Sequence, residues 1–139
     1  MYKRILLAVD GSDHSLRATE EAIKIASFTS DCAIDVVFVA DYAKAKNEVL
    51  HAQSQEELTL ARRQRLLPIE EQLKANNINY QLNILHGEPA PTIVDYANKE
   101  NFDMTIIGSR GLNSLQEMVL GSVSHKVVKR VNGPVLIVK

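Results

Sequence analysis

Five short apolar runs alternate with four stretches of helical periodicity along the chain. The runs occupy residues 5–9, 33–40, 78–85, 104–107 and 135–138, and the helical stretches occupy residues 13–28, 54–76, 89–100 and 122–131. The first helical stretch has apolar residues at the spacing of one helix face, namely Leu16, Ala22, Ile23 and Ala26. Strands that alternate with helices predict right-handed crossovers and a parallel sheet, so we expect one α/β domain over residues 1–139.

The third apolar run differs from the others because polar residues interrupt it at every second position. Ile78, Tyr80, Leu82 and Ile84 alternate with Asn79, Gln81 and Asn83. Continuous apolar runs are typical of strands covered on both faces, whereas alternation leaves one face in water. We therefore expect an open, doubly wound sheet of five parallel strands with about four helices. In the order 3-2-1-4-5, the third and fifth runs form its edges.

The fifth run, Val135-Leu136-Ile137-Val138, is wholly apolar although it is expected at an edge. An uncovered apolar edge strand promotes aggregation, so another surface is expected to cover it. We predict a homodimer that pairs through this strand.

Two stretches are less regular. Residues 41–53 have no clear period, which indicates a mobile connection. Pro68 lies inside the second helical stretch and removes one backbone hydrogen bond near Gln64, so the helix is expected to bend or break there.

Composition narrows the class of protein. Of the 139 residues, 45% are hydrophobic and 24% charged, and the formal net charge is −1, which gives no reason to expect nonspecific binding to nucleic acid or membranes. Cys32 is the only cysteine, so no internal disulfide can form; its apolar surroundings favour a packing role. The first apolar run is too short for a signal peptide or a membrane span, and we expect a cytoplasmic protein.

The turn after the first strand carries the first candidate site residues, Asp10, Gly11 and Ser12. In the expected strand order, the switch point lies between the first and fourth strands, so this turn should face Gly108 across one crevice. Asp10 has two open roles: it could bind Mg²⁺ beside phosphates, directly or through water, or accept backbone hydrogen bonds in the turn. Ser12 or Asp13 is expected to cap the first helix, and His14 to face solvent.

The most distinctive motif follows the fourth strand. Gly108-Ser109-Arg110-Gly111 is followed after nine residues by Gly121-Ser122-Val123-Ser124, where the last helix begins. Glycines allow close backbone approach to an anion, and a helix N-terminus offers N–H groups worth roughly 1.5–3 kcal/mol each to a phosphate. Arg110 could neutralise phosphate charge. The alternative is a structural loop in which the glycines serve turns and Ser122 serves as a cap.

The chain resembles the ATP-binding branch of the universal stress proteins. The resemblance covers nearly the whole chain and rests on five segments: residues 3–12, Gly87-Glu88-Pro89, Ile107-Gly108-Ser109-Arg110-Gly111, Gly121-Ser122-Val123-Ser124 and residues 133–138. The branch pattern G-x2-G-x9-G-[S/T] is matched at every position. Ala8 stands where some members have proline.

The resemblance implies an adenine nucleotide alpha-hydrolase-like fold, a cytoplasmic dimer pairing through the last strand, and ATP as ligand. It implies that Asp10 lies by the ribose and phosphates and that Val39 packs on adenine. The remaining matched positions are Ala8, Gly11, Ser12, Ile107, Gly108, Arg110, Gly111, Gly121, Ser122, Val123 and Ser124.

Three classes of function remain open. The sequence contains no phosphate-binding loop with lysine and no nucleophile elbow, so efficient catalysis is not indicated. We expect a nucleotide-sensing regulatory dimer of the stress response. The alternatives are a slow ATP hydrolase of the same fold and a scaffold dimer indifferent to nucleotide.

Overall fold

The computed structural model describes residues 2–40, 55–110 and 121–139. The elements are β1 (Arg4–Val9), α1 (Asp13–Ala26), β2 (Ala33–Ala40), α3 (Gln55–Ala75), β3 (Asn79–His86), α4 (Pro89–Glu100), β4 (Met104–Gly108), α5 (Ser122–Arg130) and β5 (Val135–Val138). The expected mobile connection at 41–53 and the candidate residue Gly111 lie outside the described residues. All nine elements expected from the periodicity of the sequence are present, with boundaries shifted by two residues or fewer.

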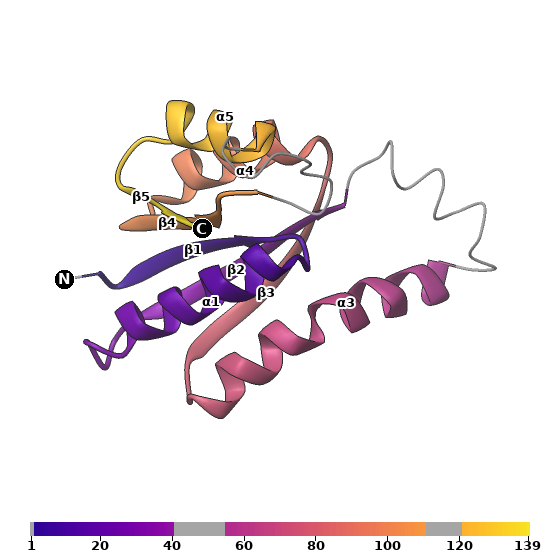
Figure 1. Ribbon diagram of the computed structural model, residues 1–139, viewed down its shortest axis with the longest axis horizontal. Coiled ribbons are helices and arrows are strands. Elements are labelled where there is room, and N and C mark those ends of the chain that lie inside the picture. Colours follow the sequence, from indigo (N-terminus) through magenta and orange to yellow (C-terminus); the bar gives the residue numbers. More distant parts are fainter. Residues whose placement is uncertain (1, 41–54, 111–120) are drawn as a thin grey trace.

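The five strands form one parallel sheet in the order β3-β2-β1-β4-β5, which confirms the prediction. Helices α1 and α3 cover one face, and α4 and α5 cover the other (Figure 1). Successive side chains of a strand point to opposite faces, so the two sides of the sheet have separate cores. This sandwich explains why β1 is apolar throughout: Ile5 and Leu7 pack toward α1 and α3, whereas Leu6 and Ala8 pack toward α4 and α5.

Helix α3 continues through Pro68, so the expected break does not occur there. Helix α3 packs on the sheet through the buried side chains of Leu66, Ile69 and Leu73. These residues lie on one side of the helix at helical spacing and belong to the same core cluster as the buried side chains of α1. Their burial at both sides of Pro68 favours one helix, although the proline removes a hydrogen bond. Leu67, the next residue along from Leu66, is 47% exposed.

Cys32 is buried in the same core cluster, just before β2. Burial, with the nearby charge of Asp103, raises the pKa of its thiol and disfavours the reactive thiolate. The packing role expected for Cys32 is therefore confirmed.

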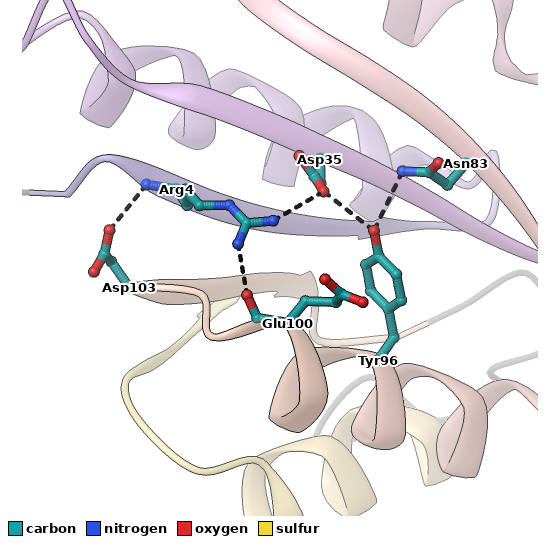
Figure 2. A network of polar contacts seen from close by, with 6 residues as sticks. All are labelled: Arg4, Asp35, Asn83, Tyr96, Glu100 and Asp103. Carbon is teal, nitrogen blue, oxygen red and sulfur yellow. Dashed lines mark hydrogen bonds and ion pairs between the residues drawn. The ribbon is translucent and has the colours of Figure 1, made fainter.

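A network of hydrogen bonds and an ion pair connects the second half of α4 to the sheet (Figure 2). The Arg4 guanidinium donates to the carbonyl of Glu100 at 2.6 Å and lies 3.6 Å from the Asp35 carboxylate. The Tyr96 hydroxyl donates to Asp35 at 3.1 Å and accepts from the Asn83 amide at 3.5 Å. Since these residues come from β1, β2, β3 and α4, the network fixes the position of α4 across three strands.

The segment between α4 and β4 adds to this anchor. The Asp103 carboxylate accepts the backbone N–H groups of Lys3 and Arg4, each at 2.9 Å, and these bonds lower the pKa of Asp103. The Arg4 guanidinium also stacks over the Phe102 ring, 4.6 Å from its centroid. The start of β1 is thus bound to the chain that leads into β4.

Candidate functional site

The carboxyl ends of β1 and β4 lie side by side at the switch point of the sheet. Ala8 pairs with Ile107 in the register of these two strands, so the turn after β1 and the loop after β4 leave the sheet together. From this end of the sheet, the chain after β4 leads to α5, and the turn after β1 leads directly into α1. The strand ends that carry the Asp10 turn and the Gly108 loop are therefore adjacent, as expected.

Asp10 organises the turn. Its Oδ1 accepts the Ser12 backbone N–H at 2.9 Å and the Ser15 hydroxyl at 2.7 Å, while the Asp10 backbone N–H donates to the Ser15 Oγ at 2.9 Å. Ser12, rather than Asp13, is the N-cap of α1, because its Oγ accepts the Ser15 N–H at 3.2 Å. Asp10 thus has the structural role considered above, exercised through Oδ1.

Gly11 has a φ of +84°, a conformation that L side chains rarely adopt. A Cβ at this position would lie 2.5 Å from Cγ of Arg65, so α3 packs directly on the turn after β1. Arg65 therefore lies beside the candidate site. No pattern in the sequence points to it, because it is one of several exposed polar positions in a long helical stretch.

The first turn of α1 occupies the space that a side chain at Gly108 would fill. A Cβ there would lie 2.7 Å from Cβ of His14 and about as close, at 3.0 and 3.1 Å, to the His14 carbonyl carbon and oxygen. His14 is consequently only partly exposed, in contrast to the expected solvent-facing position. The missing Cβ of Gly108 thus admits the first turn of α1 against the end of β4.

The two halves of the glycine motif meet through Gly108 and Ser109. The Gly121 N–H donates to the Ser109 carbonyl at 2.8 Å, and the buried Ser124 hydroxyl donates to the Gly108 carbonyl at 2.6 Å. The Ser109 N–H in turn donates to the Val138 carbonyl of β5 at 2.7 Å. These bonds hold the start of α5 at the end of β4.

Gly121 is the N-cap of α5, with extended backbone angles, and Ser122 is the first helical residue. The first turn of a helix directs N–H groups without intrahelical partners past the helix end, where the dipole is positive. Ser122 is exposed at this end. The structure therefore brings a helix N-terminus, the Gly108 loop and the Asp10 turn to the carboxyl end of the sheet.

The apolar candidates also gather on one side of the sheet. Ala8, Val39 and Ile107 belong to the core cluster under α4 and α5, and Val123 packs against it. Val39 is only 9% exposed, so little of its side chain lies open beyond the end of β2.

Within residues 2–40, 55–110 and 121–139, no group of three or more His, Cys, Asp and Glu side chains is arranged to hold a metal ion. The part of the chain that the structure describes also contains no helix with the length and apolar character needed to cross a membrane.

Comparisons with known proteins agree with this architecture. A family model of the universal stress proteins matches residues 1–139. Universal stress protein MJ0531 of Methanocaldococcus jannaschii is 33% identical over 141 residues, covering 100% of this chain and 83% of the relative. The solved structure of protein MJ0577 from the same organism has a TM-score of 0.86 and 30% identity, covering 100% of this chain and 96% of that one. A universal stress protein solved in complex with cAMP has a TM-score of 0.71 and 25% identity, covering 99% of this chain and 97% of that one. This chain belongs to the universal stress protein family.

Proposed function

We propose that this protein is an ATP-binding, nucleotide-sensing regulatory dimer that acts in the stress response. The observation that carries the proposal is the pair of hydrogen bonds from Gly121 and Ser124 to the end of β4, which hold a helix N-terminus beside the Asp10 turn. A structurally similar family member was solved with cAMP, an adenine nucleotide. The cytoplasm is the compartment we propose, since a single cysteine suits reducing surroundings.

The phosphates would lie at the start of α5. The backbone N–H groups of Ser122, Val123 and Ser124 are the donors proposed to bind them, together with the Ser122 hydroxyl and the Arg110 guanidinium. The Gly121 N–H and the Ser124 hydroxyl already bond to the chain itself, so their proposed contribution is to position these donors. Gly108 and Gly111 would contribute backbone only.

The adenosine part of the ligand would extend toward the first and second strands. Asp10, Gly11 and Ser12 are proposed to lie by the ribose and phosphates. Adenine would contact apolar side chains near the strand ends, namely Ala8, Val39, Ile107 and Val123, which share one side of the sheet.

Asp10 fits the way proteins bind Mg²⁺ beside phosphates, through one carboxylate with phosphate and water oxygens completing the shell. Two hydrogen bonds to Oδ1 fix the orientation of this carboxylate. If Mg²⁺ accompanies the nucleotide, we propose Asp10 as its protein ligand, directly or through water.

Replacing Ser122 with aspartate separates binding from folding. A carboxylate in the first turn of α5 interacts favourably with the helix dipole and stabilises the helix by about 0.3–1 kcal/mol. The same carboxylate repels a phosphate at this helix end. We expect the affinity for ATP, which should be micromolar in the wild type, to fall at least about tenfold, while the melting temperature stays equal or rises. Calorimetric titration and thermal unfolding measure the two quantities.

Ser122→Asn is the matched control, because asparagine has nearly the same size as aspartate but carries no charge. It should bind ATP within a fewfold of the wild type. Equal affinities for the wild type and Ser122→Asp would mean that phosphate does not bind at the start of α5. No binding of ATP, AMP or cAMP below about millimolar by the wild type would contradict the proposed function as a whole.

The dimer is proposed to form through β5, the last strand of the described sheet. The carbonyl of Pro134 accepts a hydrogen bond from Thr105 of β4, and the carbonyl of Val138 accepts one from Ser109, directly after β4. Backbone groups alternate in direction along a strand, so those of Val135 and Ile137 point away from β4 toward the open edge. We propose that they pair with the same strand of a second copy.

Ile137→Pro tests this pairing. Proline removes an N–H that faces the edge and leaves the bonds to β4 in place. A two-fold dimer loses the bond twice, which amounts to about 1–3 kcal/mol and a dimer Kd raised roughly 5- to 150-fold. Sedimentation at several micromolar concentrations measures the change. Ile137→Ala, which keeps the N–H, is the control for the lost side chain; a monomeric wild type would contradict the dimer.

The two alternatives make different predictions for the same protein. A slow hydrolase turns over ATP, and turnover is lost in both Asp10→Asn and Arg110→Ala. A scaffold dimer stays intact and does not respond to ATP.

A further inference from the structure

His14 occupies a position that the proposed function does not use. It lies in the first turn of α1, against the end of β4. Its ring nitrogen Nδ1 lies 3.1 Å from Nη2 of Arg17 and 3.4 Å from Oγ of Ser109. Ser109 belongs to the loop that holds the start of α5, so this imidazole borders the proposed phosphate site.

The two neighbours of Nδ1 suit different protonation states of the ring. A guanidinium can only donate, so the contact with Arg17 requires Nδ1 to be an acceptor and assigns the proton of the neutral ring to Nε2. A hydroxyl can accept, so Ser109 Oγ suits a protonated Nδ1 that donates. One nitrogen therefore has a partner for the neutral imidazole and another for the imidazolium.

We propose that His14 is a proton-linked part of the nucleotide site, which becomes an imidazolium when phosphate binds beside it. The inference rests on the proposed function. On protonation, Nδ1 can no longer accept from Arg17; the new Nδ1–H donates to Ser109 Oγ, and the positive charge attracts the bound phosphate. Arg17 keeps its second contact, in which Nε donates to the Lys139 carbonyl at 2.8 Å.

The surrounding charges support this change. Burial, then the charges of Arg17 and Arg110, lowers the pKa of His14, whereas Asp10 and Asp13 act in the opposite direction. A lowered pKa favours the neutral ring in the absence of ligand. A phosphate group carries about −1.5 to −2 charges and would offset the nearby cations. It therefore raises the pKa of His14 in the complex.

The sign of the pH dependence follows from this difference. Because the complex has the higher pKa, binding takes up a proton between the two pKa values, and affinity falls as pH rises through that interval. Above and below the interval, the affinity no longer depends on this group. One proton taken up changes the affinity by at most about tenfold per pH unit.

The test compares the full chain with His14→Gln, whose amide keeps polarity but does not titrate. ATP without Mg²⁺ is titrated calorimetrically from pH 5.5 to 8.5, in pairs of buffers with different ionisation enthalpies. The terminal phosphate of ATP titrates in this range too, so the relevant quantity is the difference between the proteins. We expect the wild type to take up several tenths of a proton more than His14→Gln and to lose about threefold or more additional affinity over the range.

Two further measurements make the outcome decisive. The NMR pKa of the His14 ring should rise when ATP is added and stay unchanged with adenosine, which has no phosphate. Equal proton uptake and parallel pH profiles for the two proteins would overturn the role of His14 while leaving nucleotide binding intact. No binding at any pH would overturn both proposals.

Discussion

Gly108→Val is expected to lower the free energy of unfolding by about 3 kcal/mol or more. Even the first side-chain atom would lie 2.7 Å from Cβ of His14 and close to the His14 backbone carbonyl. Flexible side chains can move aside, but these atoms belong to the first turn of α1, which Ser12 and Asp10 hold in place. Relief requires α1 to shift away from β4, with the loss of core contacts on that side of the sheet.

Denaturant unfolding measures this effect, and Gly133→Val is the control. Gly133 has a φ of +105° but no atom within 4 Å of an added Cβ, so valine there adds backbone strain without a clash. The control should cost roughly 1–2 kcal/mol. If Gly108→Val proved no more destabilising than Gly133→Val, the close packing of α1 on β4 would not constrain the fold.

Leu66→Ala is expected to cost about 3 kcal/mol, within the usual range for a buried leucine. Its side chain has no exposed surface and belongs to the apolar row that joins α3 to the core. Loss of the first side chain of this row leaves a cavity between α3 and the core. The same row explains the continuity of α3 through Pro68.

Leu67→Ala is a matched control for Leu66→Ala, because it makes the same chemical change one position along the same helix. Leu67 is 47% exposed, so its loss should cost less than about 1 kcal/mol. Urea unfolding measures the loss of stability of each variant from the shift in its midpoint, provided that the slope of the unfolding free energy against urea concentration is unchanged. Similar costs for the two variants would show that α3 is not held by the buried row.

The periodicity of the sequence predicted the elements because the pattern of most strands reflects what covers their faces; β5, which is wholly apolar at an edge, is the exception. The alternation from Ile78 to Ile84 places β3 at an edge, and the unbroken apolar run of β1 places that strand in the centre. Strand order then brings the Asp10 turn and Gly108 together. These predictions depend on local patterns and general topology, so they did not require a knowledge of particular contacts.

Contacts between distant segments could not be predicted in the same way. The sequence predicts that Gly108 serves an anion site or a turn, and only the structure shows that the first turn of α1 packs against it. His14 and Arg65 lie at the site because α1 and α3 pack on Gly108 and Gly11, which lie where β4 and β1 end. No periodic signal distinguishes these two residues from exposed polar neighbours.

Ser109 connects the start of α5, where the nucleotide is proposed to bind, with β5, where the dimer is proposed to form. Its carbonyl receives the N–H of Gly121 at the start of α5, and its N–H reaches the carbonyl of Val138 in β5. The backbone of one residue therefore links the proposed nucleotide site to β5, the strand proposed to form the dimer. A displacement of α5 by a ligand would reach the edge strand through the backbone of Ser109, with no relay through the core.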